Sequence, residues 1–358
     1  MALHSPATPR SAVAGAGLLG RLLAWQLARR GHHVEVFDPA AGPDARGAAG
    51  WTAAGMLSPV AELECADEQV YALGLRSMAL WPRIAADIGA PLGLRFEGSL
   101  LLAHRGDEGA ARRVVDLLAA KAPAGHGPEP LDAARLRALE PGVQRLPHAW
   151  LLPGEGQIDT VLAMQALAEA AAAAGARFHW GCTVERVGPG WLETQGRRIE
   201  ADRVFDVRGT GARPQLPVRG VRGEIVHLYA PGLVLHRPLR LLHPRHRVYI
   251  VPRAGERVLV GASEIESEDR SPISLRSTVE LLTAAHSVLP ALAEARIVHT
   301  ETNLRPALPH NLPELHRAPG LTQINGLFRH GWLIGPALVE QALSADSQHT
   351  SISDEPLS

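Results

Sequence analysis

A glycine-rich turn near the N-terminus places the strongest constraint on the fold. A short apolar strand over residues 11–14 runs into Gly15-Ala-Gly-Leu-Leu-Gly20, and a helix follows as far as Arg30. A second strand over residues 33–38 completes a strand, turn, helix and strand within about 30 residues, the length of a βαβ unit. This pattern predicts a right-handed crossover and a parallel sheet.

The three glycines of this turn have the spacing that binds the pyrophosphate of a dinucleotide. Gly15 allows the tight turn, Gly17 lets the backbone approach the phosphates, and Gly20 permits close packing of the helix on the strand. The helix N-terminus favours an anion, and Asp38 stands where a carboxylate accepts hydrogen bonds from a ribose. The predicted cofactor contacts in this unit are Gly15, Ala16, Gly17, Leu18, Leu19, Gly20 and Asp38.

The turn by itself leaves the choice between NAD and FAD open. Two features favour FAD. The pattern occurs once, at the N-terminal end, and a second Gly-rich segment, residues 44–58, follows the second strand closely. The extended flavin half of the cofactor would lie along that segment.

Composition argues against several other classes of protein. Apolar residues make up 46% and charged residues 20%, which predicts a folded chain. The 36 Lys and Arg balance 37 Asp and Glu, so no overall charge attracts nucleic acid or an anionic membrane. The two cysteines, Cys65 and Cys182, are too few for a disulfide framework and fit a cytoplasmic location. No long apolar run or signal peptide is present, so we expect no membrane span.

Further along the chain, the patterns predict several helices and a strand-rich region. A helix is expected at residues 67–88, broken or kinked at Pro82, and a strand at residues 327–334 followed by a helix through Glu340. Other helices are expected at 110–121, 131–140, 160–175 and 277–289. Strand-like segments at 224–229, 248–252 and 257–262 indicate a mainly antiparallel region.

Four later motifs carry a family resemblance. They are Ala53-Ala-Gly-Met-Leu57, Val248-Tyr-Ile-Val-Pro-Arg253, Leu304-Arg-Pro306 and Phe328-Arg-His-Gly331. With the glycine turn and Asp38, they occur in the order seen in the glycine oxidase (ThiO-type) branch of the D-amino-acid oxidase family. The chain resembles this family over most of residues 11–343.

The resemblance implies a fold of class α/β plus α+β, with FAD bound non-covalently. It consists of a Rossmann-like FAD-binding domain and a mainly antiparallel-sheet substrate domain. We expect the FAD-binding domain to comprise residues 1–88, 150–216 and 300–345. The substrate domain would comprise residues 89–149 and 217–299, and residues 346–358 would form a tail.

The resemblance also implies further cofactor contacts. The Gly-Met-Leu segment would lie along the flavin, a valine after the alanine-rich helix would touch the adenine, and the segment after Arg329 would wrap the flavin and pyrophosphate. The corresponding residues are Ala54, Gly55, Met56, Val184, Gly209, Gly211, His330, Gly331, Leu333 and Ile334.

Three residues are implied at the substrate. Tyr249 and Arg305 would hold a carboxylate, and Arg329 would lie beside the flavin and substrate. Arginine suits this role because its two parallel N–H donors match a carboxylate. The alternatives are a structural salt bridge for Arg305 and a packed strand aromatic for Tyr249.

Some positions depart from the family pattern. Asp206 and Arg208 bring charge to a strand end that is normally neutral, and Ser58 follows the Met-Leu pair. The segment after Asn311-Leu-Pro313 lacks the usual glycine. None of these changes removes a group that the reaction needs.

The resulting hypothesis is an FAD enzyme that oxidises glycine, sarcosine or a D-amino acid. If the amine binds neutral, hydride transfer from Cα to flavin N5 needs mainly orientation. No side chain is then required to abstract the Cα proton. Oxygen would reoxidise the flavin and give peroxide, and the imine could supply thiazole synthesis for thiamine. A quinone acceptor and a homo-oligomer stay open.

Two other functions stay open from the sequence. An Arg-rich stretch, Arg237–Arg247, would suit an FAD enzyme that acts on an amine attached to tRNA, and the glycine turn would also suit an NAD-dependent dehydrogenase. No metal is expected, because His243-x-x-His246 lies in a Pro- and Arg-rich connection and His32-His33 precedes a strand without a helical i, i+4 partner.

Overall fold

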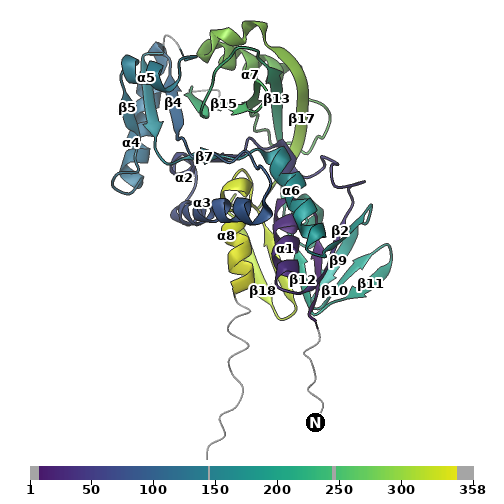
Figure 1. Cartoon of the computed structure of the whole chain (residues 1–358). Coiled ribbons are helices and arrows are strands. Elements are labelled where there is room, and N and C mark those ends of the chain that lie inside the picture. Colours follow the sequence, from purple (N-terminus) through teal and green to yellow (C-terminus); the bar gives the residue numbers. More distant parts are fainter. Residues whose placement is uncertain (1–7, 144–145, 244–246, 345–358) are drawn as a thin grey trace, which may run out of the picture.

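The computed structural model describes residues 8–143, 146–243 and 247–344, and Figure 1 shows their arrangement. The helices are α1 (Leu18–Arg29), α2 (Pro59–Glu62), α3 (Glu68–Ile88), α4 (Glu108–Lys121), α5 (Ala133–Leu139), α6 (Thr160–Ala173), α7 (Leu275–Val288) and α8 (Gly331–Ser344). The tail predicted over residues 346–358 lies outside the described residues.

One sheet contains the glycine turn. Its six strands run in the order β18 (Glu314–Ala318), β19 (Leu321–Asn325), β12 (Arg203–Asp206), β1 (Arg10–Ala14), β2 (His33–Asp38) and β8 (Arg177–Trp180). All neighbours are parallel except β18 and β19. The predicted βαβ unit and its parallel sheet are therefore present.

Alternate residues of this sheet pack on two different layers. Val13 of β1 and Val36 of β2 belong to a core that includes helices α1, α6 and α8. Ala12 and Ala14 face the other way, against a three-stranded meander of β9 (Val184–Gly188), β10 (Trp191–Thr194) and β11 (Arg197–Glu200). Both faces are covered, as is usual for a parallel sheet.

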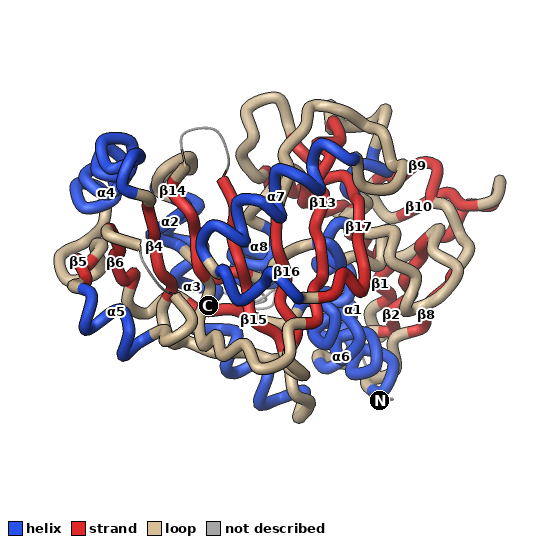
Figure 2. The backbone as a smooth tube through the Cα atoms, turned by 90° about the horizontal axis from the view of Figure 1, so that it is seen from above, coloured by secondary structure: helices blue, strands red, loops and turns tan. Residues whose placement is uncertain are grey.

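The second sheet is mainly antiparallel, as the sequence predicted. Its order is β17 (Arg296–Ala307), β13 (Arg219–Tyr229), β16 (Arg257–Gly261), β15 (Arg247–Arg253), β14 (Leu239–Leu242), β4 (Ser99–Ala103), β6 (His148–Leu152) and β5 (Glu129–Leu131). Only β14 and β4 pair in parallel. Helix α7 lies across one face (Figure 2), where its apolar residues share a core with β13, β15 and β16.

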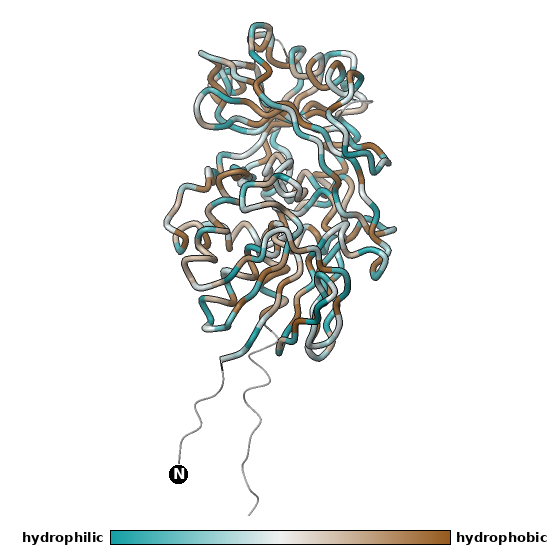
Figure 3. Tube along the Cα trace, turned by 90° about the vertical axis from the view of Figure 1, so that its right-hand side faces the viewer, coloured by the Kyte–Doolittle hydropathy of each residue, from teal (hydrophilic) through white to brown (hydrophobic). Residues whose placement is uncertain are grey.

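Hydrophobic segments follow the strands and the helices packed on them, and hydrophilic segments gather in the outer loops (Figure 3). The two sheets meet at the Gly-rich segment that follows β2. Asn303 of β17 donates through Nδ2 to the carbonyls of Arg46 and Ala48 at 3.0 and 3.2 Å. Further along the chain, β3 (Met56–Leu57) pairs with β7 (Gly156–Gln157) in a short antiparallel ladder.

Two expected features are absent, a break in the helix at Pro82 and a strand over residues 327–334. Helix α3 runs unbroken through Pro82, which lies on its exposed side between the buried Trp81 and Ile84. The strand expected over residues 327–334 ends earlier, because Gly326 and Phe328 have φ values of 75° and 45°. Such left-handed residues cannot extend a strand, so a turn leads into α8 at Gly331. The proposed domain boundaries stay a prediction.

Candidate active site

A large cavity of about 1680 Å³ is lined by residues from both sheets. It extends from the glycine turn at the ends of β1 and β2 to Tyr249 and Arg305 on the antiparallel sheet. Ligand cavities are typically about 300–1,000 Å³. The volume is therefore large enough for a dinucleotide together with a small substrate.

The glycine turn has the close contacts that its spacing predicted. Gly15 has a φ of 102°, and a Cβ there would lie 2.8 Å from the carbonyl oxygen of Val207. A Cβ on Gly20 would lie 1.8 Å from the carbonyl oxygen of Gly15, so any larger residue would push α1 away from the turn. At Gly17 a Cβ would lie 3.7 Å from Cβ of Ala48, an ordinary van der Waals contact, and the residue lines the cavity.

Asp38 lies at the end of β2, beside this turn. Its Oδ2 accepts a hydrogen bond from the Ala16 amide at 2.6 Å, and its Oδ1 accepts from the Ala40 amide at 2.8 Å. Each oxygen retains a second lone pair. Asp38 therefore braces the turn and can still accept from a ribose in the cavity.

The Ala54–Met56 segment lies along the cavity wall between the two sheets. Gly55 has a φ of 65°, its carbonyl accepts from the Ile158 amide at 2.8 Å, and a Cβ there would lie 2.1 Å from the Ile158 carbonyl oxygen. The carbonyl of Ala54 accepts from Nη2 of Arg253 at 2.5 Å. The segment is thus fixed from both sides and presents its backbone to the cavity.

Most predicted cofactor residues line the cavity. Gly20, His330 and Ile334 do not: Gly20 serves packing, Ile334 is fully buried in the core, and His330 is 3% exposed beside Glu62. Those that do are Gly15, Ala16, Gly17, Leu18, Leu19, Asp38, Ala54, Gly55, Met56, Val184, Gly209, Gly211, Gly331 and Leu333.

The departures at Asp206 and Arg208 form one unit. Arg208 donates to both carboxylate oxygens of the fully buried Asp206, at 2.8 and 2.9 Å. It also donates to the carbonyl of Val184 at 3.0 Å. The two charges therefore compensate each other and tie β9 to the end of β12.

Tyr249 and Arg305 come together because strands far apart in sequence become neighbours. Tyr249 of β15 pairs with Gly261 of β16, and a Cβ on Gly261 would lie 2.8 Å from the Tyr249 hydroxyl. A Cβ on Gly223 of β13 would lie 2.6 Å from Cζ of Arg305. The two glycines leave room for the phenol and the guanidinium to lie flat against the sheet.

Arg305 has no acidic partner of its own. Its Nη1 and Nη2 both donate to the Ser263 carbonyl at 3.1 Å, and no carboxylate of the described residues forms an ion pair with it. Burial lowers the pKa of Arg305, although the nearby Tyr249 and, at longer range, Glu264 partly offset this. Burial likewise raises the pKa of Tyr249, against the opposing effect of Arg305. The site therefore holds a desolvated cation beside a neutral phenol.

Arg329 also lines the cavity, but it differs from Arg305 in being paired. Its Nε lies 3.3 Å from Oε2 of Glu62, and its Nη1 lies 3.6 Å from Oε2 of Glu264. The attraction of Glu62 raises the pKa of Arg329 in spite of burial. The role predicted for Arg329 at the substrate stays a prediction.

Sequence reasoning missed several residues that shape the site. Gly223 and Gly261 could have been noticed as glycines inside strands, which often mark a close approach. Glu62 and Glu264 carried no local signal, because their importance depends on facing Arg329.

Among the described residues, no group of three His, Cys, Asp or Glu side chains is arranged to hold a metal ion. His246, named above with His243, lies outside the described residues. No helix in the described part of the chain is long and apolar enough to cross a membrane.

The family of the chain follows from comparison with known proteins. The model of the FAD dependent oxidoreductase family (DAO) matches residues 10–342. The chain belongs to this family. It is therefore an FAD-dependent oxidoreductase, and the resemblance found in the sequence is confirmed.

Individual relatives agree with this assignment. A Rhizobium etli protein named "Putative thiamine biosynthesis oxidoreductase ThiO" is 38% identical, over 92% of this chain and 94% of the relative. The crystal structure of glycine oxidase from Geobacillus kaustophilus has a TM-score of 0.83 and 29% identity, covering 97% of this chain and 96% of that one. Iminodiacetate oxidase from Chelativorans sp. BNC1 has a TM-score of 0.79 and 26% identity, covering 97% of both chains.

The residues present fit FAD. The turn at Gly15 and Gly20 has no room for side chains, Gly17 lines the cavity without a side chain, and Gly55 fixes a second backbone segment in the same cavity. These features suit the pyrophosphate and the flavin half of the cofactor, respectively. The NAD alternative is replaced by the FAD of the family.

Proposed function

We propose that this enzyme oxidises the Cα–N bond of a small amino acid such as glycine, sarcosine or a D-amino acid. The observation that carries the proposal is the Arg305 guanidinium, which lines the cavity beside Tyr249 without a carboxylate partner among the described residues. A desolvated cation without an anion is costly to bury, so a substrate carboxylate is the natural partner.

Each side chain has a defined part in the proposed reaction. Arg305 and the Tyr249 hydroxyl bind the substrate carboxylate and orient its Cα–H bond, which is worth several kcal/mol in a reaction limited by orientation. FAD, when bound, supplies the redox chemistry by accepting a hydride. No side chain needs to remove the Cα proton, provided that the amine binds neutral.

The overall change would be amino acid, oxygen and water giving an oxo acid, ammonia or an amine, and hydrogen peroxide. Oxygen as acceptor is part of the proposal. The names of relatives such as ThiO and glycine oxidase support small amino acids as substrates and a role in thiamine synthesis.

A tRNA-linked amine is a second candidate. A relative from Azoarcus named as a tRNA 5-methylaminomethyl-2-thiouridine biosynthesis protein, MnmC, is 30% identical over 99% of this chain and 59% of its own length. The Arg-rich stretch gives this candidate little support. Arg237 donates to the Leu139 carbonyl at 2.6 Å, Arg240 is 9% exposed, and Arg247 lies 3.0 Å from Glu64. These cations are engaged within the protein.

The test uses the FAD-loaded protein mixed without oxygen with glycine, sarcosine, D-alanine or L-alanine. We expect loss of the oxidised flavin absorbance with at least one of the first three. Admission of air should then restore the colour and release peroxide. A flavin that stays oxidised with every small amino acid, but is reduced by tRNA carrying a methylamino group, would replace this proposal with the second candidate.

A further inference from the structure

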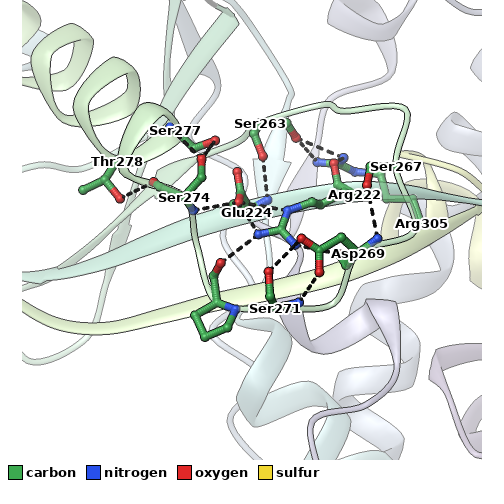
Figure 4. Close-up of polar contacts among 11 residues, drawn as sticks. Arg222, Glu224, Ser263, Ser267, Asp269, Ser271, Ser274, Ser277, Thr278 and Arg305 are labelled. Atoms are coloured by element: carbon green, nitrogen blue, oxygen red, sulfur yellow. Dashed lines mark hydrogen bonds and ion pairs between the residues drawn. The ribbon is translucent and has the colours of Figure 1, made fainter.

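Beneath the substrate site, on the opposite face of the same sheet, lies a buried ion pair (Figure 4). Arg222 and Glu224 are two residues apart on β13 and are 4% and 0% exposed. Nε and Nη2 of Arg222 both donate to Oε1 of Glu224, at 3.0 and 2.6 Å. Gly223, between them, points to the other face, where the Arg305 guanidinium lies over it. The pair therefore sits directly behind the proposed carboxylate clamp.

This pair forms hydrogen bonds with the segment that joins β16 to α7, here called the 262–274 loop. Arg222 donates to the carbonyls of Asp269 and Pro272 at 2.6 and 2.8 Å, and its Nη1 lies 3.2 Å from the Asp269 carboxylate. Glu224 accepts from the amide of Ser274 at 3.0 Å. The second part of the loop, residues 269–274, is thus held to β13 at both of its ends.

The first part of the loop, residues 262–264, lines the cavity at the proposed substrate site. The Ser263 amide donates to the Glu224 carbonyl, and the Ser263 hydroxyl accepts from the Glu224 amide at 3.0 Å. The carbonyl of the same serine accepts both Nη donors of Arg305. The next residue, Glu264, faces Arg329 across the cavity. A shift of this loop would therefore move the partner that orients Arg305.

Glu224 carries a negative charge in the folded protein. Burial by itself would raise the pKa of Glu224, but the Ser277 hydroxyl and the Arg222 guanidinium outweigh it and lower the pKa. Glu224 is therefore ionised at neutral pH. A buried charge held in this way is costly to keep unless its partner stays in place, so it fixes one geometry.

We propose that Glu224 is a positioning residue for substrate binding, acting through Arg222 and the 262–274 loop on the Ser263 carbonyl and hence on Arg305. The inference rests on the proposed function, because it assigns Arg305 to the substrate carboxylate. Glu224 touches neither the substrate nor the cofactor. Its effect is to hold the guanidinium plane in the orientation that matches a carboxylate.

The test compares Glu224→Gln with the wild-type holoenzyme. Glutamine keeps the shape and can still accept from the Ser274 amide, but it removes the charge that holds Arg222. We expect KM for the amino acid to rise about tenfold while kcat changes less than threefold, the pattern of lost uniform binding. Glycolate, a carboxylate that cannot be oxidised at an amine, should perturb the flavin spectrum with a dissociation constant raised by a similar factor.

The matched control is Glu140→Gln. Glu140 is also fully buried, lies 3.2 Å from Arg237 and accepts from the backbone amides of His236 and Arg237, but neither partner belongs to the 262–274 loop. This variant should lose thermal stability and keep KM and glycolate binding at wild-type values. A Glu224→Gln protein that is yellow, less stable and unchanged in KM and glycolate affinity would overturn the proposal, because Glu224 would then be structural only.

A milder pair of variants covers the case in which Glu224→Gln fails to fold. Asp269→Asn weakens the outer contact with Arg222 and the hydrogen bonds that the carboxylate accepts from the amide and hydroxyl of Ser271, but Asp269 is largely exposed and the Arg222–Glu224 pair is kept. We expect a two- to threefold rise in KM and in the glycolate dissociation constant. The control is Asp87→Asn. Asp87 is exposed and pairs with Arg29, and both residues are far in sequence from the 262–274 loop. Equal constants in the two variants would also overturn the proposal.

The wild type separates this proposal from the proposed function. If the wild-type holoenzyme neither turns over small amino acids nor responds to glycolate, the proposed function fails. If the wild type does both and the variants match it, only the role of Glu224 fails.

Discussion

Two arginines in the same cavity differ in the residues that each contacts. Arg329 forms ion pairs with Glu62 and Glu264, whereas Arg305 forms none among the described residues: it donates to backbone carbonyls, lies beside Tyr249 and is affected by Glu264 only at longer range. A carbonyl accepts a hydrogen bond without cancelling the charge. Arg305 is therefore the cation that retains capacity for an anionic ligand, and the planar fork of its guanidinium matches a carboxylate.

Arg305→Lys is expected to raise KM about ten- to a hundredfold and to leave FAD bound. Lysine keeps the charge but loses the paired donors, and a hydrogen bond to a charged group is worth about 1.5–3 kcal/mol, with about 1.4 kcal/mol for each factor of ten. Steady-state kinetics and the flavin absorbance of the purified protein measure the two effects. Arg296→Lys, an exposed change on the same strand, should alter neither. Wild-type KM in Arg305→Lys would refute the clamp.

Among the elements, the single-turn helix α2 shows how short segments acquire a fixed position. Four residues are too few to form a stable helix by local interactions. Here the buried Glu155 accepts from the Ala61 amide at 3.0 Å and from the Ser99 hydroxyl at 2.5 Å. At the other end, Glu62 lies 3.2 Å from Nδ1 of His330, next to the start of α8. Tertiary contacts therefore hold α2 between the antiparallel sheet and α8.

Glu62→Gln is expected to lower the free energy of unfolding by about 3 kcal/mol at pH 7, the usual cost of removing one partner of a largely buried pair. Burial would raise the pKa of Glu62, but Arg329 and His330 outweigh it and lower the pKa. A lowered pKa gives stability that is present above the ordinary carboxyl range and lost as pH falls through the folded-state pKa.

Urea unfolding of wild type and Glu62→Gln at several pH values measures this difference. It should shrink as the pH falls below about 4.3, the ordinary glutamate value. A difference that grows on acidification would show that Glu62 is not held ionised by Arg329.

At the scale of the whole molecule, the cavity joins two sheets that the chain builds from interleaved segments. Strand β17 of the antiparallel sheet anchors the Gly-rich loop of the parallel sheet through Asn303, and the cavity contains residues from both. A cofactor bound there would contact both parts at once. Its binding energy therefore adds to the stability of the folded chain as a whole.

Removal of FAD is expected to lower the thermal midpoint, and adding FAD back should restore it. At a hundredfold excess over the dissociation constant, the gain is about 2.7 kcal/mol in the free energy of unfolding. Differential scanning calorimetry of the FAD-free protein with increasing FAD measures the gain. NAD at the same concentrations is the control and should have no effect. Equal stabilisation by NAD would contradict the FAD assignment of this cavity.

Local sequence determined the parts of this protein that depend on neighbours along the chain. The glycine turn, Asp38 and the strands around it could be predicted because their spacing encodes a turn, a helix N-terminus and a strand end within one βαβ unit. The motifs around Tyr249 and Arg305 were identified by family resemblance. The failures at Pro82 and at residues 327–334 arose where packing or left-handed residues overrode the local pattern.

Tertiary structure alone decided which side chains meet. Tyr249 and Arg305 are more than fifty residues apart, and they share a site because β15, β16, β13 and β17 pair in that order over two glycines. The partners of Arg329 come from α2 and from the 262–274 loop, which only the fold brings to the same cavity. Hydrophobic periodicity in the sequence determines which face of a sheet a side chain takes. The side chains that it then meets depend on the order of the strands. Strand order depends on long-range contacts, which no local pattern in the sequence records.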